Sequence, residues 1–121
     1  MAKYVDGFVI PVPKKNLAAY KRLAKVACKV WMEHGALEYR ECVGEELVSK
    51  FGVSFAKLSK AKAGETVVFA WIVYKSKADR NRINAKVMAD PRIAKAMSPK
   101  VKMPFDPKRM AHGGFEVLVE A

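Results

Sequence analysis

The chain has 121 residues, which is the length of one domain, because domains cluster near ~100–150 residues. Hydrophobic residues make up 51% and charged residues 29%, a composition that excludes a disordered chain and favours a globular domain with a core. Lys and Arg number 23 against 12 Asp and Glu, so the net charge of +11 permits an anionic partner without establishing one. We expect a single domain over residues 1–121.

Targeting and cofactor signals are missing from the sequence. A charge at Asp6 stands where a signal peptide would be apolar, and the longest apolar run, 67–74, is far shorter than the ~20 residues that cross a bilayer. We expect a cytoplasmic protein without a membrane partner. Cys28 and Cys42 form no Cys-x-x-Cys pair and are expected to be buried thiols, while His34 and His112 lack the spacing of metal ligands. We therefore expect no metal, haem or other cofactor.

The first half of the chain predicts a strand, a helix and a second strand. Residues 4–12 are rich in β-branched and aromatic side chains, and Pro11 and Pro13 end the strand because proline lacks a ladder donor. Residues 14–34 place apolar side chains at alternating steps of three and four, which predicts a helix that Gly35 caps. Residues 37–43 alternate in polarity and predict the second, half-exposed strand.

The second half of the chain predicts an irregular segment, a third strand, a second helix and a last strand. Residues 45–64 have a weak pattern and are predicted to be irregular and partly extended. Residues 66–75 are nearly all apolar, as in a central strand. Ser76 and Asp79 form a helix start, and the helix runs to Ala89, where the Asp90-Pro91 pair interrupts it before a short turn over 93–97. The alternation at Phe115, Val117 and Val119 predicts a last strand.

The resulting order is βαββαβ, which predicts an α+β, ferredoxin-like fold with two helices on one face of a four-stranded antiparallel sheet. The opposite face cannot be polar. Strand one presents Tyr4, Phe8 and Ile10 on one side and Val5 and Val9 on the other. Because a large exposed apolar patch usually marks an interface, we expect a second sheet to cover it in a homodimer.

Several segments resemble a known family. They are the runs 4–8 (YVDGF), 35–41 (GALEYRE), 64–69 (GETVVF), 103–106 (MPFD), 108–110 (KRM) and 113–116 (GGFE). Together they resemble the YbaA-like proteins, a family known as domain of unknown function 1428, over essentially the whole chain. The resemblance implies a dimeric α+β barrel, in which two ferredoxin-like sheets pack face to face. It implies no reaction and no catalytic residue.

The preferred functional interpretation is a small-molecule binder, and the residues leave open whether it is an enzyme. Carboxylates at Asp6, Glu38 and Glu41 near Arg40 are able to orient a polar ligand or to carry acid–base chemistry, although a cross-strand or cross-dimer ion pair is the simpler explanation of this cluster. Aromatic side chains are able to line a pocket or to pack the core and the dimer seam. The predicted ligand-binding residues, in the barrel or between sheet and helices, are Asp6, Tyr39, Arg40, Trp71 and Glu116. No catalytic signature is present.

The alternative interpretation is a module that binds RNA or another polyanion. Residues 47–113 carry fifteen basic and four acidic side chains, so the positive charge is concentrated there. A surface that follows phosphates would use Lys77, Arg80, Arg82 and Lys86. The family resemblance adds an occasional label relating to signal-recognition-particle RNA, but the sequence has no RNA-binding motif, and a solvated basic surface explains the same charges.

Overall fold

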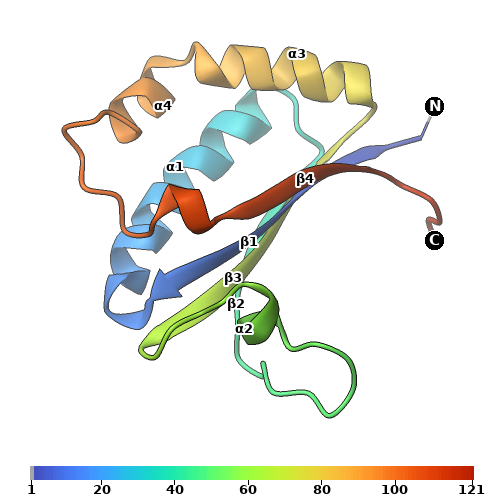
Figure 1. Ribbon diagram of the computed structural model, residues 1–121. Coiled ribbons are helices and arrows are strands. Elements are labelled where there is room, and N and C mark those ends of the chain that lie inside the picture. Colours follow the sequence, from blue (N-terminus) through green and yellow to red (C-terminus); the bar gives the residue numbers. More distant parts are fainter. Residues whose placement is uncertain (1) are drawn as a thin grey trace.

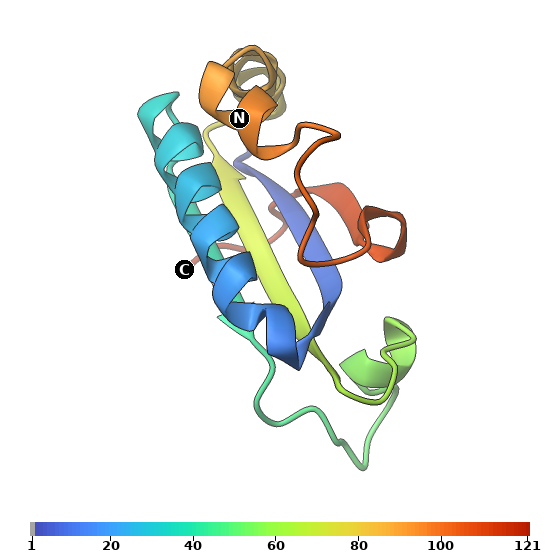
Figure 2. The same ribbon diagram turned by 90° about the vertical axis from the view of Figure 1, so that its left-hand side faces the viewer.

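The computed structural model describes residues 2–121 and contains one antiparallel sheet. Its strands are β1 (Tyr4–Pro13), β2 (Glu38–Val43), β3 (Glu65–Tyr74) and β4 (Ala111–Glu116), in the order β2-β3-β1-β4. The longer helices are α1 (Leu17–Glu33), α3 (Lys77–Met88) and α4 (Pro91–Ala96), and a short helix α2 (Phe55–Leu58) follows β2. Helices α1, α3 and α4 lie on the same side of the sheet, with α3 and α4 next to α1 (Figure 1, Figure 2). The predicted α+β, ferredoxin-like order is confirmed.

The predicted end of the first helix, the start of the second and the break at Asp90-Pro91 are confirmed by their caps. The first helix begins at Leu17 and not at residue 14, because residues 14–16 form a 3-10 helix, and the short last helix covers 91–96 and not 93–97. Helix α1 ends before Gly35, whose φ of 115° is a conformation that favours glycine. The Ser76 hydroxyl accepts the Asp79 N–H at 3.1 Å at the start of α3. The Asp90 carboxylate accepts the Arg92 N–H at 2.9 Å at the start of α4, and Pro91 occupies the first turn of this helix.

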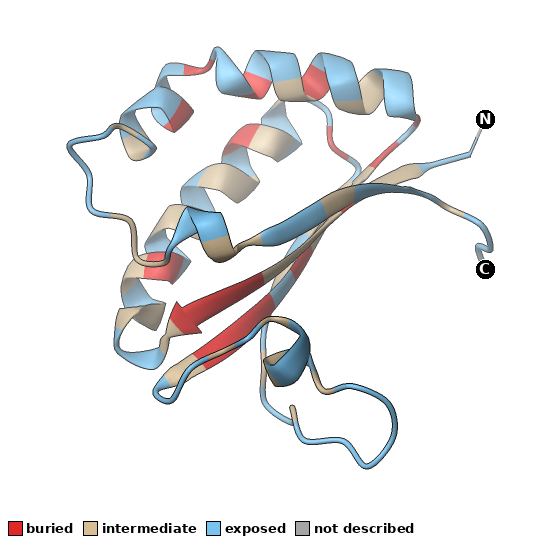
Figure 3. Ribbon diagram, in the orientation of Figure 1, coloured by how far each residue is buried: buried red, intermediate tan, exposed pale blue. Residues whose placement is uncertain are grey.

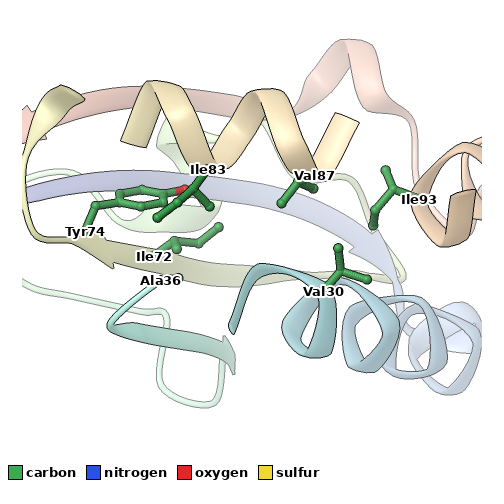
Figure 4. Packing of buried hydrophobic residues seen from close by; sticks show 7 residues of the cluster. All are labelled: Val30, Ala36, Ile72, Tyr74, Ile83, Val87 and Ile93. Atoms are coloured by element: carbon green, nitrogen blue, oxygen red, sulfur yellow. The ribbon is translucent and has the colours of Figure 1, made fainter. Parts of the chain in front are cut away.

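Alternate residues of the strands face the helices and form the core. On β1 these are Asp6, Phe8, Ile10 and Val12, and the register pairs Asp6 with Ile72 on β3. Buried residues concentrate on the β1 and β3 segments and on the inward sides of the helices (Figure 3). In one cluster, side chains from α1, β3, α3 and α4 meet (Figure 4): Val30, Ala36, Ile72, Tyr74, Ile83, Val87 and Ile93.

The opposite sheet face is apolar and largely uncovered. Val5, Val9 and Trp71 are partly exposed there, and Phe69 is 43% and Phe115 60% exposed. Helix α2 lies over one end of this face, where Phe55 packs on Phe69 with ring centroids 5.6 Å apart (Figure 1). We call the surface formed by Val5, Val9, Phe69, Trp71 and Phe115 the open sheet face.

Two sequence expectations need correction. Cys42 lies on the open sheet face beside Phe69 and is exposed, whereas a buried thiol was expected. The last strand is β4, residues 111–116, so it begins before Phe115 and includes neither Val117 nor Val119. The physical reason is register. Strand β1 begins at Tyr4, which pairs with Glu116, so residues after 116 lie beyond the end of the neighbouring strand.

Candidate functional site

A cavity of about 570 Å³ lies between the helices and the sheet. All four strands, helices α1, α3 and α4 and the connector 97–110 contribute to its wall. It is open to solvent between β4 and the α3–α4 region, because the lining residues His112, Gly114, Met88 and Met97 are also exposed. Most of its wall is apolar, with side chains that include Phe8, Ile10, Leu23, Ala27, Ala70 and Ile72. Such a space has the size and the chemistry of a small-molecule site.

A polar network occupies the end of the cavity beneath α3. The buried Asp6 carboxylate lies 3.5 Å from the Arg80 guanidinium and accepts a hydrogen bond from the Asn84 amide at 3.5 Å. The Trp31 indole N–H donates to the Asn84 carbonyl at 3.0 Å and lies 3.1 Å from the Tyr74 hydroxyl. Burial and the neighbouring Asp6 carboxylate raise the pKa of Tyr74, so this phenol stays neutral.

Arg80 is positioned by aromatic packing and retains free hydrogen-bonding capacity. Its guanidinium lies over the Tyr4 ring, 4.8 Å from the centroid, and donates to the Tyr4 hydroxyl at 3.3 Å. The Tyr4 ring in turn lies over Gly114, where a β-carbon would overlap it. The Arg80 Nε is buried and has no hydrogen-bond partner within residues 2–121. An acceptor on a bound molecule would satisfy it.

A second polar group, Glu41 of β2, faces the same cavity. Both carboxylate oxygens are engaged, one by the Tyr20 hydroxyl and the other by the Tyr39 hydroxyl at 2.6 Å. Burial, with the bond to Glu41, raises the pKa of both tyrosines well above the ordinary value, so each remains a neutral donor. The sequence grouped Glu41 with Asp6, Glu38 and Arg40, whereas the fold places its carboxylate against Tyr20 of α1.

Four methionines line the outer part of the cavity. Met88 ends α3, Met97 follows α4, and Met103 and Met110 belong to the connector that closes the space beside β4. Methionine is unbranched and polarizable, so it adapts to ligands of different shape. This wall therefore suits apolar ligands of several shapes better than it suits a single rigid ligand.

The predicted ligand-binding residues separate into two groups. Asp6 and Tyr39 line the cavity. Arg40 and Trp71 pair across β2 and β3 on the open sheet face, and Glu116 is exposed at the end of β4. The expected closeness of Arg40 to Asp6 is wrong, because β3 lies between their strands and the two residues face opposite sides of the sheet. Arg40 instead pairs with Glu38 at 2.7 Å.

The residues predicted for a polyanion surface are also divided. Arg80 points inward to Asp6 and Tyr4, and Arg82 lies 3.4 Å from Asp79 one turn earlier on α3. Lys77 and Lys86 are exposed. Two of the four cations are therefore engaged within the domain, which weakens the case for α3 as a phosphate-binding surface.

The sequence did not predict Tyr20, Trp31 and Asn84 as cavity residues. Tyr20 and Trp31 lie on the apolar side of the helix it predicted, and that spacing signals burial without revealing which hydroxyl or N–H reaches a polar partner. Asn84 directly follows the buried Ile83 on α3. This position beside the apolar side of the helix was the sequence feature from which an inward-facing amide could have been predicted.

The part of the chain that the structure describes, residues 2–121, contains neither a metal-binding cluster nor a membrane-spanning helix. There, no three His, Cys, Asp or Glu side chains gather as a metal ion would require. None of the helices in this range combines the length and apolar character needed to cross a membrane.

Comparison with known proteins identifies the family. The model of a family described as protein of unknown function (DUF1428) matches residues 3–107. The chain belongs to this family. It is 42% identical over 118 residues to the uncharacterized protein YbaA of Escherichia coli K12, covering 98% of both chains, and it has the same identity and coverage with YbaA of Shigella flexneri. The resemblance seen in the sequence is confirmed.

Two solved structures share the fold of this DUF1428 chain. One is a dimeric ferredoxin-like protein from an uncultured marine organism, with a TM-score of 0.59, 12% identity and full coverage of both chains. The other is a nipsnap family protein with unknown function from Agrobacterium tumefaciens, with a TM-score of 0.58 and 13% identity, covering 96% of this chain and 88% of the other. At these identities the likeness shows the fold alone.

Proposed function

We propose that this protein binds a small, mostly apolar molecule in the cavity between its helices and sheet. The observation that carries the proposal is the cavity of about 570 Å³, which lies within the ~300–1,000 Å³ range of ligand sites. Its apolar wall supplies the driving force for binding, and the two polar ends at Asp6 and Glu41 supply orientation. The mouth beside His112 supplies an entry path.

A cavity-filling variant tests this proposal. Ala24 of α1 lines the cavity, whereas Ala18 lies on the same helix and is exposed. Ala24→Phe should abolish binding of the apolar probe 2-phenylethanol, measured by calorimetry, because the new ring occupies the probe's space. Ala18→Phe is the matched control and should bind as the wild type does. Equal binding by both variants would refute the cavity as the site.

We propose in addition that the protein is a homodimer joined through the open sheet face, forming an α+β barrel. The support is the exposure of apolar side chains such as Phe69 and Phe115, which monomers rarely leave as one continuous patch. The solved relative with the same fold is described as dimeric. In such a dimer, Arg40 and Trp71 would lie at the seam between the two sheets and not in the cavity of one subunit.

The polyanion alternative is separated from small-molecule binding by its salt response. Neutralising phosphates releases counterions, so the logarithm of affinity would fall with the logarithm of salt by ~0.7 to ~0.9 per contact. Binding of 2-phenylethanol in an apolar cavity should change little between low and high salt. A labelled single-stranded RNA that binds with a steep salt slope, and loses that binding in the Lys77→Ala and Lys86→Ala double variant, would favour the alternative.

A further inference from the structure

We infer that the ligand of this cavity carries a positively charged amine, which Glu41 binds between Tyr20 and Tyr39. The inference rests on the proposed function, because it specifies the chemistry of a molecule bound in the same cavity. It is carried by two observations, the balance of charge in the cavity wall and the arrangement of aromatic rings around the Glu41 carboxylate.

The cavity wall holds one negative charge that the protein does not balance. Its carboxylates are Asp6 and Glu41, and its single guanidinium is that of Arg80. Arg80 lies 3.5 Å from Asp6. In the part of the chain that is described, no Lys, Arg or His nitrogen lies within 4.0 Å of the Glu41 carboxylate. A carboxylate facing an apolar space gains most from a ligand that brings the opposite charge.

The two tyrosines hold Glu41 without neutralising it. Both hydroxyls donate to its oxygens, and burial keeps the pKa of each tyrosine above its ordinary value, so neither supplies a charge. An ionised carboxylate has about four lone-pair positions, so two donors leave acceptor capacity for an ammonium group. The tyrosines therefore orient the carboxylate and leave its charge available to a ligand.

Two further aromatic rings pack against the tyrosines that bond this carboxylate. Trp31 packs on Tyr39 with centroids 6.2 Å apart, and Phe105 packs edge-on against Tyr20 at 5.6 Å. All four rings line the cavity. Ring faces attract a cation within about 6 Å of their centroids, and the attraction strengthens when the cation is desolvated. A carboxylate within a group of aromatic rings is thus suited to an alkylammonium ion and poorly suited to an anion.

A matched series of probes tests the inference on the wild-type protein. The probes are 2-phenylethylamine, 2-phenylethanol and phenylacetate, which share a ring and differ in charge. Calorimetry at pH 7 should show the amine binding at least ~10-fold more tightly than the alcohol, with phenylacetate weakest. An amine that binds no more tightly than the alcohol would overturn the inference while leaving the proposed cavity intact. Failure of all three probes would overturn both.

Two variants localise the effect. Glu41→Gln should bring the affinity for 2-phenylethylamine down to that for 2-phenylethanol, because it removes the charge and retains the shape. Glu38→Gln is the control, since Glu38 lies three residues earlier on the other sheet face and pairs with Arg40. An amine preference that persists in folded Glu41→Gln would refute Glu41 as its source, and if that variant does not fold, the wild-type probe series decides.

Discussion

Gly114 is the residue whose small size positions one end of the cavity. A β-carbon there would lie 2.7 Å from Cε2 of Tyr4, which overlaps the ring that carries Arg80. We expect Gly114→Ala to displace Tyr4 and to lower the free energy of unfolding by ~1–3 kcal/mol, as overpacking does. Gly113→Ala is the control, because its β-carbon would meet only Phe115 at 3.8 Å. Urea unfolding measures both, and equal losses would contradict this account of Tyr4.

The Glu65–Arg109 pair predicts part of the acid sensitivity. Arg109 contacts both carboxylate oxygens, at 2.7 and 2.9 Å, and this bonding lowers the pKa of Glu65 from 4.5 to about 2. A depressed carboxyl pKa contributes stability that is present above pH 4.5 and is lost as the pH falls toward 2. Arg109→Met should therefore reduce the fall in melting temperature between pH 6 and pH 2. An unchanged fall would show that the pair does not contribute.

At the scale of elements, two serine caps on helices of different burial make a matched pair. Ser76 caps α3, which buries Ile83 and Val87, whereas Ser54 caps the exposed four-residue helix α2. Ser76→Ala should cost ~1 kcal/mol of unfolding free energy, because α3 is part of the core. Ser54→Ala should cost less than half of that, since local fraying of α2 leaves the core intact. Denaturant unfolding followed by circular dichroism tests this order, and the reverse order would contradict it.

At the scale of the whole molecule, the open sheet face predicts assembly. Phe69→Lys places a charge in the proposed interface, and Met32→Lys does so on α1 at almost the same exposure, 43% against 42%. Light scattering at micromolar concentration should give twice 13.5 kDa for the wild type and for Met32→Lys, and a monomer for Phe69→Lys. A wild-type mass of 13.5 kDa would refute the dimer.

Local signals in the sequence determined the elements and their order. The three-and-four spacing of α1, the glycine after it, the Ser76 start of α3 and the Asp90-Pro91 break each act within a few residues, so the chain states them directly. The long motifs shared with the DUF1428 family were equally readable. Residues 45–64 carry a weak pattern, and only the four residues of α2 are helical there.

Tertiary structure alone decided which side chains meet. Both faces of β1 are apolar, so its sequence could not show that Phe8 faces the helices and Val9 the open sheet face. The position of β4 depends on where β1 begins, and the separation of Arg40 from Asp6 depends on β3 lying between their strands. The contact of Glu41 with Tyr20 joins residues 21 positions apart in the chain. Such juxtapositions arise from strand order and helix docking, which periodicity within one element does not encode.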